Sequence, residues 1–136
     1  MKELTITGKS VVEGTVAGEA VVSLEPVGFN GGIDPKTGEF VERGHPLCGT
    51  NVKGKIMVFP TGKGSTGGSY ILYAANQNGV GPAGIVMQEL EPIIVIGAII
   101  SEIPLISVSA EEMDKVHTGD MVELDASRGV ATIRRP

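Results

Sequence analysis

The sequence predicts a mixed α/β domain that is rich in β-strands and built in layers. Glycine accounts for 20 of the 136 residues, about twice its usual share, which indicates many turns and close backbone approaches. Aromatic residues make up only 4% and tryptophan is absent, so the core must use smaller aliphatic side chains, and many of these are the β-branched residues that favour strands. Strand-like segments at both ends enclose strand–loop–helix–strand units, a pattern typical of helices packed on a sheet.

The N-terminal part predicts two strands followed by a polar connection. Leu4–Ser10 alternates apolar and polar residues and continues into a pair of valines, and after Gly14 a second strand-like segment covers Val16–Leu24. The stretch Phe29–Arg43 is polar and rich in glycine. Within it, Asp34–Gly38 has the residues of a proline-led turn, which predicts a short hairpin.

The middle of the chain predicts buried strands that alternate with helix. Gly54–Phe59 is a compact apolar run, and the proline that follows it cannot donate to a strand ladder, so pairing should end there. Tyr70–Asn78 is the best helix candidate because an asparagine and a glycine mark its end. Ala83–Met87 has buried-strand character again. The apolar segment Pro92–Ile100 fits a helix or a strand equally well.

The C-terminal part predicts a strand, a short helix and a hairpin. Ile103–Val108 has strand character, and Ser109 stands three residues before a glutamate, which is the spacing of a capping box. A short helix is therefore expected over Ala110–Val116. The segments Asp120–Leu124 and Gly129–Ile133 are expected to pair as a terminal hairpin.

Length, charge and cysteine content narrow the class of protein. The length predicts one domain over residues 1–136. A net charge of −5 with few aromatics makes a nucleic-acid partner unexpected, because phosphate contacts need a basic surface. The longest apolar run, Ile93–Ile100, is far too short to cross a membrane, and no secretory signal is visible, so we expect a cytoplasmic protein. The single cysteine, Cys48, excludes a self-contained iron–sulfur or cysteine-rich zinc site, and no metal site is evident.

The glycine-rich loop Lys63–Ser69 is the best candidate for chemistry. It follows a predicted buried strand and precedes a predicted helix, which is where α/β folds place ligand sites. The free N–H groups at a helix start favour an anionic ligand. Ser65 would lie at the tip of the loop, with Lys63 as a nearby cation. The spacing matches neither a P-loop nor a nucleophile elbow, and by itself the loop favours a simple glycine-rich connection between strand and helix.

Other reactive side chains have simpler interpretations. We expect His45 to be a loop histidine that hydrogen-bonds to the backbone and His117 to be exposed in a turn. Cys48 is expected to be a small buried hydrophobe rather than a reactive thiol. Glu89 and Glu91 are explained by a solvated edge.

Several segments together resemble the small subunit, or swivel domain, of the aconitase-X-type dehydratases. The Gly-Lys-Gly-Ser-Thr segment after a Val-Phe-Pro strand is the most specific of them, and the resemblance covers most of the chain, from about Gly14 to Val130. The matching segments are His45-Pro46-Leu47, Gly54–Pro60, Gly62–Thr66, Ser69, Glu91-Pro92-Ile93 and Ile103-Pro104.

The resemblance implies a swivelling β/β/α fold and a large catalytic subunit as partner. That partner would carry a 4Fe–4S cluster on its own three cysteines, so this chain alone would bind no cofactor. In the wider aconitase family the swivel domain supplies a Gly-Ser-Ser-Arg loop, and these positions align with Gly64, Ser65, Thr66 and Gly67.

The alignment gives Ser65 the role of the base that takes a proton beside the substrate carboxylate, while the partner's iron acts on the leaving hydroxyl. Gly67 replaces the arginine that would pair with a carboxylate, which argues against citrate or isopropylmalate as substrate. Lys63 or loop N–H groups could hold an anion instead. The predicted substrate-binding residues are Lys63, Gly64, Thr66, Gly67, Gly68 and Ser69.

The family has two activities, and a free-standing small subunit favours the archaeal one. That form dehydrates (R)-5-phosphomevalonate, a phosphorylated hydroxy acid, to trans-anhydromevalonate 5-phosphate, whereas the bacterial form dehydrates cis-3-hydroxy-L-proline. A phosphocarrier swivel domain is an alternative, but it needs a histidine in the glycine-rich loop, and none lies between Pro46 and Val116. A non-catalytic assembly domain is the third hypothesis.

Overall fold

The computed structural model describes residues 2–135, and its fold is the predicted β-rich α/β class. The elements in chain order are β1 (Lys2–Thr7), β2 (Lys9–Val12), β3 (Thr15–Val22), β4 (Ile56–Phe59), α1 (Gly67–Gln77), β5 (Gly84–Met87), α2 (Pro92–Ser101), β6 (Leu105–Ser107), α3 (Ala110–Met113), β7 (Met121–Asp125), the 3-10 helix η1 (Ala126–Arg128) and β8 (Val130–Arg135). None of the helices within this range is long and apolar enough to cross a membrane.

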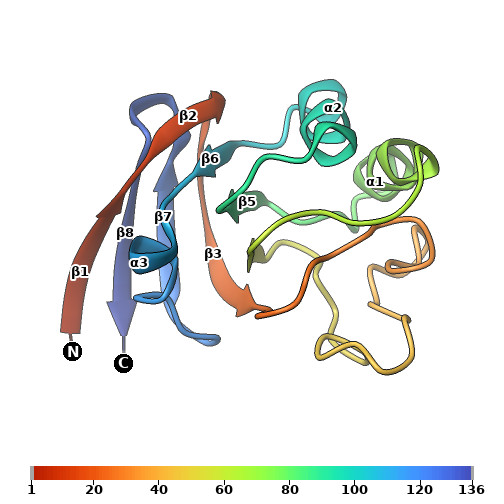
Figure 1. The fold of residues 1–136 in the computed structure, drawn as a ribbon, viewed down its shortest axis with the longest axis horizontal. Coiled ribbons are helices and arrows are strands. Elements are labelled where there is room, and N and C mark those ends of the chain that lie inside the picture. The colour runs from red at the N-terminus through yellow and green to blue at the C-terminus, as the bar shows by residue number, and fades with distance from the viewer. Residues whose placement is uncertain (1, 136) are drawn as a thin grey trace.

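The eight strands form one mixed sheet that curls into a half-barrel (Figure 1). Their order is β1-β8-β7-β3-β4-β5-β6-β2. Strand β3 joins the two halves, because residues 15–19 pair antiparallel with β7 while residues 20–22 pair parallel with β4. The strands β4, β5 and β6 run parallel, as expected for strands linked by crossover helices.

The two ends of the sheet are connected by one N-terminal segment. Strand β1 pairs with β8 and, after Gly8, strand β2 pairs with β6. The predicted single strand over Leu4–Ser10 is therefore two strands. A Cβ atom at Gly8 would lie 1.9 Å from the carbonyl oxygen of Ser107, so the chain can pass from one pairing to the other only at a residue without a side chain.

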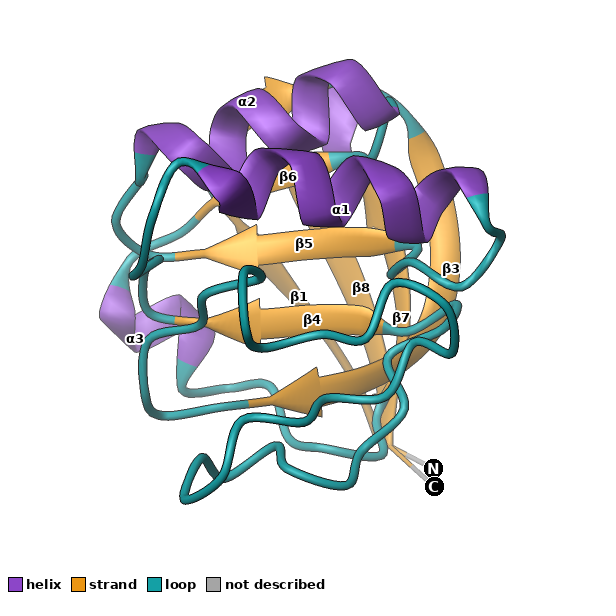
Figure 2. Ribbon diagram, turned by 90° about the vertical axis from the view of Figure 1, so that its right-hand side faces the viewer, coloured by secondary structure: helices purple, strands orange, loops and turns teal. Residues whose placement is uncertain are grey.

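The core has two parts, one on each face of the parallel strands. Figure 2 shows the arrangement of the elements around them, with β1, β7 and β8 behind β4 and β5. On β4, Met57 and Phe59 point toward helices α1 and α2, whereas Ile56 and Val58 point toward the antiparallel strands β7 and β8. All four side chains are fully buried. The result is three layers, a β-layer, a second β-layer and a layer of helices.

The segment that sequence periodicity left undecided is helix α2. The Glu91 carboxylate accepts hydrogen bonds from the backbone N–H groups of Ile93 and Ile94, and Pro92 follows it at the first helical position. Glu91 is therefore a helix cap and not part of a solvated edge. The helix ends at Glu102, which adopts the left-handed conformation with φ of 55°.

Two other predicted helices have different bounds in the structure. Helix α1 begins at Gly67, so three residues assigned to the loop belong to its first turn. Helix α3 ends at Met113 instead of Val116, although Ser109 caps it as expected by accepting the N–H of Glu112 at 3.2 Å. The glutamate carboxylate accepts the N–H of Thr7 instead of closing the capping box. The hairpin of β7 and β8 is confirmed.

An ion pair with a buried carboxylate fixes the C-terminal strand to the start of β7. Asp120 is 2% exposed and accepts two hydrogen bonds from the Arg135 guanidinium, both at 2.9 Å, and one from the backbone N–H of His117. The hydrogen bonds from Arg135 lower the pKa of the Asp120 carboxyl below its usual range, and the N–H of His117 adds to this.

Candidate active site

The glycine-rich loop lies at the carboxyl edge of the parallel strands. Strand β4 ends at Phe59 and helix α1 begins at Gly67. The N–H groups of Gln88 and Glu89, which follow β5, donate to the carbonyl oxygen of Pro60. Ser65 is exposed, as its predicted role requires, and Gly64 before it has φ of 104°. The turn before the serine therefore needs a residue without a side chain.

A second segment, residues 26–30, runs alongside the loop and fixes its backbone. The N–H of Val27 donates to the carbonyl oxygen of Thr61, and the N–H of Lys63 donates back to that of Val27, both at 3.1 Å. A Cβ atom at Gly28 would lie only 2.4 Å from the carbonyl oxygen of Lys63. The two segments therefore contact each other backbone to backbone just before the exposed serine.

The Ser65 hydroxyl has a hydrogen-bond partner on this second segment. Asn30 Nδ2 donates to Ser65 Oγ at 2.6 Å, across 35 residues of sequence. Asn30 reaches the hydroxyl past Gly67, where a Cβ atom would lie 2.8 Å from Asn30 Nδ2. The absence of a side chain at Gly67 thus leaves the space that the Asn30 amide occupies.

The N-terminus of helix α1 carries no capping side chain. Thr66 stands at the N-cap position without a side-chain hydrogen bond, and the first turn contains no acidic residue. The N–H of Gly68 donates to the carbonyl oxygen of Ser65 at 3.0 Å. This helix end therefore keeps the positive electrostatic character that favours a negative charge on or near Ser65.

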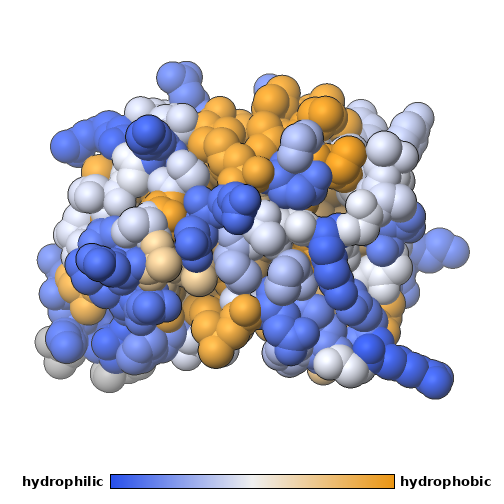
Figure 3. All heavy atoms as spheres, in the orientation of Figure 1, coloured by the Kyte–Doolittle hydropathy of each residue, from blue (hydrophilic) through white to orange (hydrophobic). Residues whose placement is uncertain are grey.

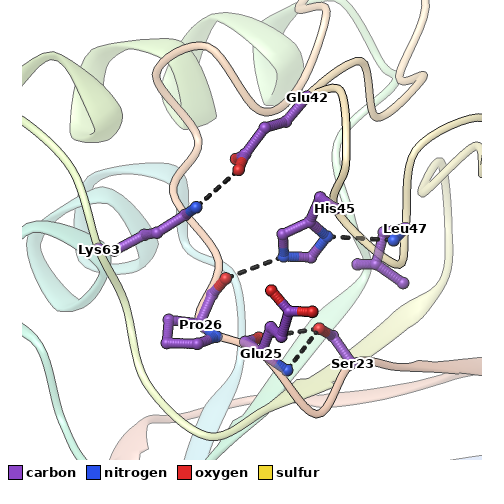
Figure 4. Close-up of polar contacts among 7 residues, drawn as sticks. All are labelled: Ser23, Glu25, Pro26, Glu42, His45, Leu47 and Lys63. Carbon is purple, nitrogen blue, oxygen red and sulfur yellow. Dashed lines mark hydrogen bonds and ion pairs between the residues drawn. The ribbon is translucent and has the colours of Figure 1, made fainter.

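Lys63 is held in an ion pair beside the loop (Figure 4). Its ammonium group lies 2.6 Å from a carboxylate oxygen of Glu42, and the two side chains are 45% and 29% exposed. An anion at the loop would have to compete with Glu42 for this cation. The pair is accessible to water, so its rearrangement costs little free energy.

His45 is a structural residue, as predicted from the sequence. It is 5% exposed, its Nε2 lies 2.9 Å from the carbonyl oxygen of Pro26, and its Nδ1 accepts the N–H of Leu47 (Figure 4). The ring also packs on Phe40 at a centroid distance of 4.7 Å. Both ring nitrogens are occupied, so His45 supports the segment before Asn30 and is not available to carry a phosphoryl group.

The remaining predicted residues have the following places. Gly68 is buried against Ile93, and Ser69 donates its hydroxyl to the carbonyl oxygen of Ile93 at 2.7 Å, so both fix α1 against α2. His117 is exposed, as expected. The expectation for Cys48 was wrong, because its side chain is exposed in the loop that follows His45.

Sequence reasoning missed Asn30 and Glu42, the partners of Ser65 and Lys63. Both lie in the stretch interpreted as a polar connection, and no spacing relates them to the loop. The Asn30-Gly31-Gly32 sequence indicates a turn and nothing more.

Helix α2 presents aliphatic side chains to solvent, which gather at the top of Figure 3, and the neighbouring α1 exposes two tyrosines. Tyr70, one turn into α1, is 79% exposed, and Ile96, Ile99 and Ile100 of α2 are each about half exposed. A surface hollow is lined by Tyr70, Tyr73 and Ile100. Contiguous exposed apolar patches are typical of surfaces that contact another molecule.

The described residues do not fit a metal cofactor of their own. Among residues 2–135, no group of three or more His, Cys, Asp or Glu side chains is arranged to hold a metal ion. Cys48 is the single cysteine of the chain. Residues 2–135 therefore offer no ligand set for an iron–sulfur cluster.

This chain has the three layers and the serine loop between β4 and α1 that are expected of a swivel domain. The sequence profile of the aconitase X swivel domain matches residues 5–133, and the chain belongs to this family. It is 42% identical to the phosphomevalonate dehydratase small subunit of Methanosarcina acetivorans, over 100% of this chain and 95% of that protein. The corresponding protein of Pyrococcus horikoshii is 45% identical, with 96% of each chain covered.

A solved structure shows the same fold. The crystal structure of Thermococcus kodakaraensis aconitase X in its holo-form superposes with a TM-score of 0.92 at 41% identity, covering 97% of this chain and 99% of that chain. The swivelling β/β/α fold implied by the sequence resemblance is thereby confirmed.

Proposed function

We propose that this chain is the small subunit of a dehydratase that converts (R)-5-phosphomevalonate to trans-anhydromevalonate 5-phosphate, and that Ser65 is its catalytic base. The observation that carries the proposal is the match, over nearly the full length of both chains, to proteins named phosphomevalonate dehydratase small subunit. The exposed position of Ser65 at the carboxyl edge of the sheet supports it.

In this proposal Ser65 Oγ, as an alkoxide, removes a proton from the carbon beside the substrate carboxylate. The electron pair of that C–H bond forms the new double bond while the hydroxyl leaves from the neighbouring carbon. A serine hydroxyl is a weak base unless its anion is stabilised. Two features of the site supply that stabilisation, the hydrogen bond from Asn30 and the uncapped N-terminus of α1.

The partner in this proposal is the large catalytic subunit, with a 4Fe–4S cluster. The cluster belongs to that subunit because this chain has a single cysteine. The large subunit must cover the loop for Ser65 to reach a substrate bound at the cluster. Tyr70, one helical turn from the loop, offers an exposed aromatic contact of the kind enriched in interfaces.

The substrate is held by the loop that carries Ser65. Lys63, Gly64, Thr66 and Gly67 are exposed or partly exposed around the serine. The side chain of Lys63 provides a cation for the carboxylate or the phosphate. Gly68 and Ser69 are less accessible, and the only support for their predicted role in substrate binding is that they lie in the first turn of α1.

The experiment is reconstitution with the large subunit under anaerobic conditions, followed by an assay of two substrates. We expect turnover of (R)-5-phosphomevalonate, with product identified by mass spectrometry, and none of cis-3-hydroxy-L-proline. Turnover of hydroxyproline alone would replace the proposed substrate. Failure of the two chains to purify together would favour a non-catalytic assembly domain.

A charge prediction follows from the ion pair of Lys63 with Glu42. Lys63→Ala should raise KM for the phosphorylated substrate about tenfold, the value of one charge-assisted hydrogen bond, with a smaller change in kcat. Glu42→Gln should lower KM because it releases the Lys63 ammonium. Steady-state kinetics of the reconstituted enzyme measure both effects.

The matched control is the Lys55–Glu19 pair, whose nitrogen and oxygen lie 2.5 Å apart at the start of β4. Lys55→Ala removes a comparable surface ion pair and should leave KM unchanged. Equal KM values for Lys63→Ala and Lys55→Ala would remove the anion-binding role of Lys63.

A further inference from the structure

We infer that Asn30 is the positioning residue of the reaction, holding the Ser65 oxygen in place and stabilising its negative charge, and that Gly67 is required so that Asn30 can do so. This inference rests on the proposed function and adds a residue to it that neither the loop sequence nor the family resemblance assigns.

The hydrogen bond has the direction that a base requires. Asn30 Nδ2 is a donor, and it lies 2.6 Å from Ser65 Oγ. The serine oxygen accepts this hydrogen bond in the hydroxyl and in the alkoxide form. Because a donated hydrogen bond is stronger to the charged oxygen, it shifts the balance toward the alkoxide.

The position of Asn30 is fixed by its neighbours. Phe29 is 1% exposed, and its carbonyl oxygen accepts the N–H groups of Gly32 and Ile33, both at 3.1 Å. On the other side, the hydrogen bonds between Val27 and the loop align the two segments. Asn30 therefore follows a buried anchor that fixes its backbone beside the loop, and its exposed amide lies within hydrogen-bond distance of the serine oxygen.

The Asn30 amide lies in the space that a side chain at Gly67 would occupy. A Cβ atom at position 67 would lie 2.8 Å from Asn30 Nδ2 and 3.2 Å from its Cγ. Any larger side chain there would displace the amide. The absence of a side chain at position 67 therefore lets the Asn30 amide lie where it reaches Ser65 Oγ, and a substitution there would require the amide to move from this place.

The test uses the enzyme reconstituted with its large subunit and (R)-5-phosphomevalonate. Asn30→Ala should lower kcat about 10- to 100-fold, the effect of one hydrogen bond to a charged group, with KM nearly unchanged. Asn30→Asp should lower kcat further although it is almost the same size, because a carboxylate opposes the alkoxide. In both variants the rise of kcat with pH should move to higher pH, which a purely structural role would not produce.

The coupling to Gly67 is tested by a double-mutant cycle. Gly67→Ala should reproduce the loss of Asn30→Ala, and the double variant should be no slower than Asn30→Ala alone, because the added methyl group then has space. The matched control is Asn78→Ala. Asn78 Nδ2 donates to the carbonyl oxygen of Pro35 at the far end of α1, so this variant should keep wild-type kcat.

The outcomes separate this inference from the proposed function. If Ser65→Ala loses activity while Asn30→Ala and Asn30→Asp keep the wild-type kcat and pH profile, the role of Asn30 is overturned and that of Ser65 stands. If Asn30→Asp is faster than Asn30→Ala, the amide does not stabilise an alkoxide. If Ser65→Ala itself keeps wild-type kcat, both assignments fail.

Discussion

Replacing Ser65 with alanine is expected to lower kcat of the reconstituted enzyme by about 10²–10⁴-fold, the usual contribution of a general base. The side chain is exposed at the tip of the loop, so its removal leaves no buried cavity and the two subunits should still assemble. Rate measurements under saturating (R)-5-phosphomevalonate, with size-exclusion chromatography of the same sample, distinguish a chemical defect from a failure of assembly.

The matched control for Ser65→Ala is Ser10→Ala, which removes an exposed hydroxyl from strand β2. This variant should retain wild-type kcat. A Ser65→Ala enzyme with near-normal kcat would show that the proton is taken by a group on the large subunit, and the small subunit would then serve only to close the site.

The largest expected effect on stability comes from Asp120→Asn. This substitution removes the charge that pairs with Arg135 and should lower the free energy of unfolding by about 3 kcal/mol. We place the effect at the low end for a buried ion pair because the Arg135 side chain is 25% exposed and can regain water. Urea unfolding followed by circular dichroism at pH 7 measures the difference.

The same variant should change the pH dependence of stability. The folded protein holds the pKa of Asp120 below its usual value, so the stabilisation is present above the unfolded-state pKa of about 3.9 and is lost as the pH falls through the lower folded-state pKa. The gap between wild type and Asp120→Asn should therefore be full at pH 7 and close in strong acid.

The control for the acid effect is Glu112→Gln. Hydrogen bonding to Lys115 lowers the pKa of Glu112 as well, but this pair lies at the surface, where ion pairs contribute little. Glu112→Gln should therefore lower the free energy of unfolding at pH 7 clearly less than Asp120→Asn does. Equal decreases in the free energy of unfolding for the two variants would show that the burial of Asp120 does not strengthen its ion pair.

Most elements could be predicted because their signals are local. The run Gly54–Phe59 is apolar on both faces, as a central parallel strand requires, and the structure buries strand β4 completely. Ser109 predicted a helix start at the correct residue. The segment Pro92–Ile100 could not be assigned from its apolar pattern alone, and the choice of helix depends on Glu91, whose carboxylate acts as the cap.

The sequence by itself determined the class of fold, the family resemblance and the serine loop, because each depends on residues that are close together in the chain. Only the tertiary structure brought Asn30 to Ser65 and Glu42 to Lys63, across 35 and 21 residues. The physical reason is that both partners lie in an irregular segment without periodicity. Its path is set by backbone hydrogen bonds to the loop and by the buried ring of His45.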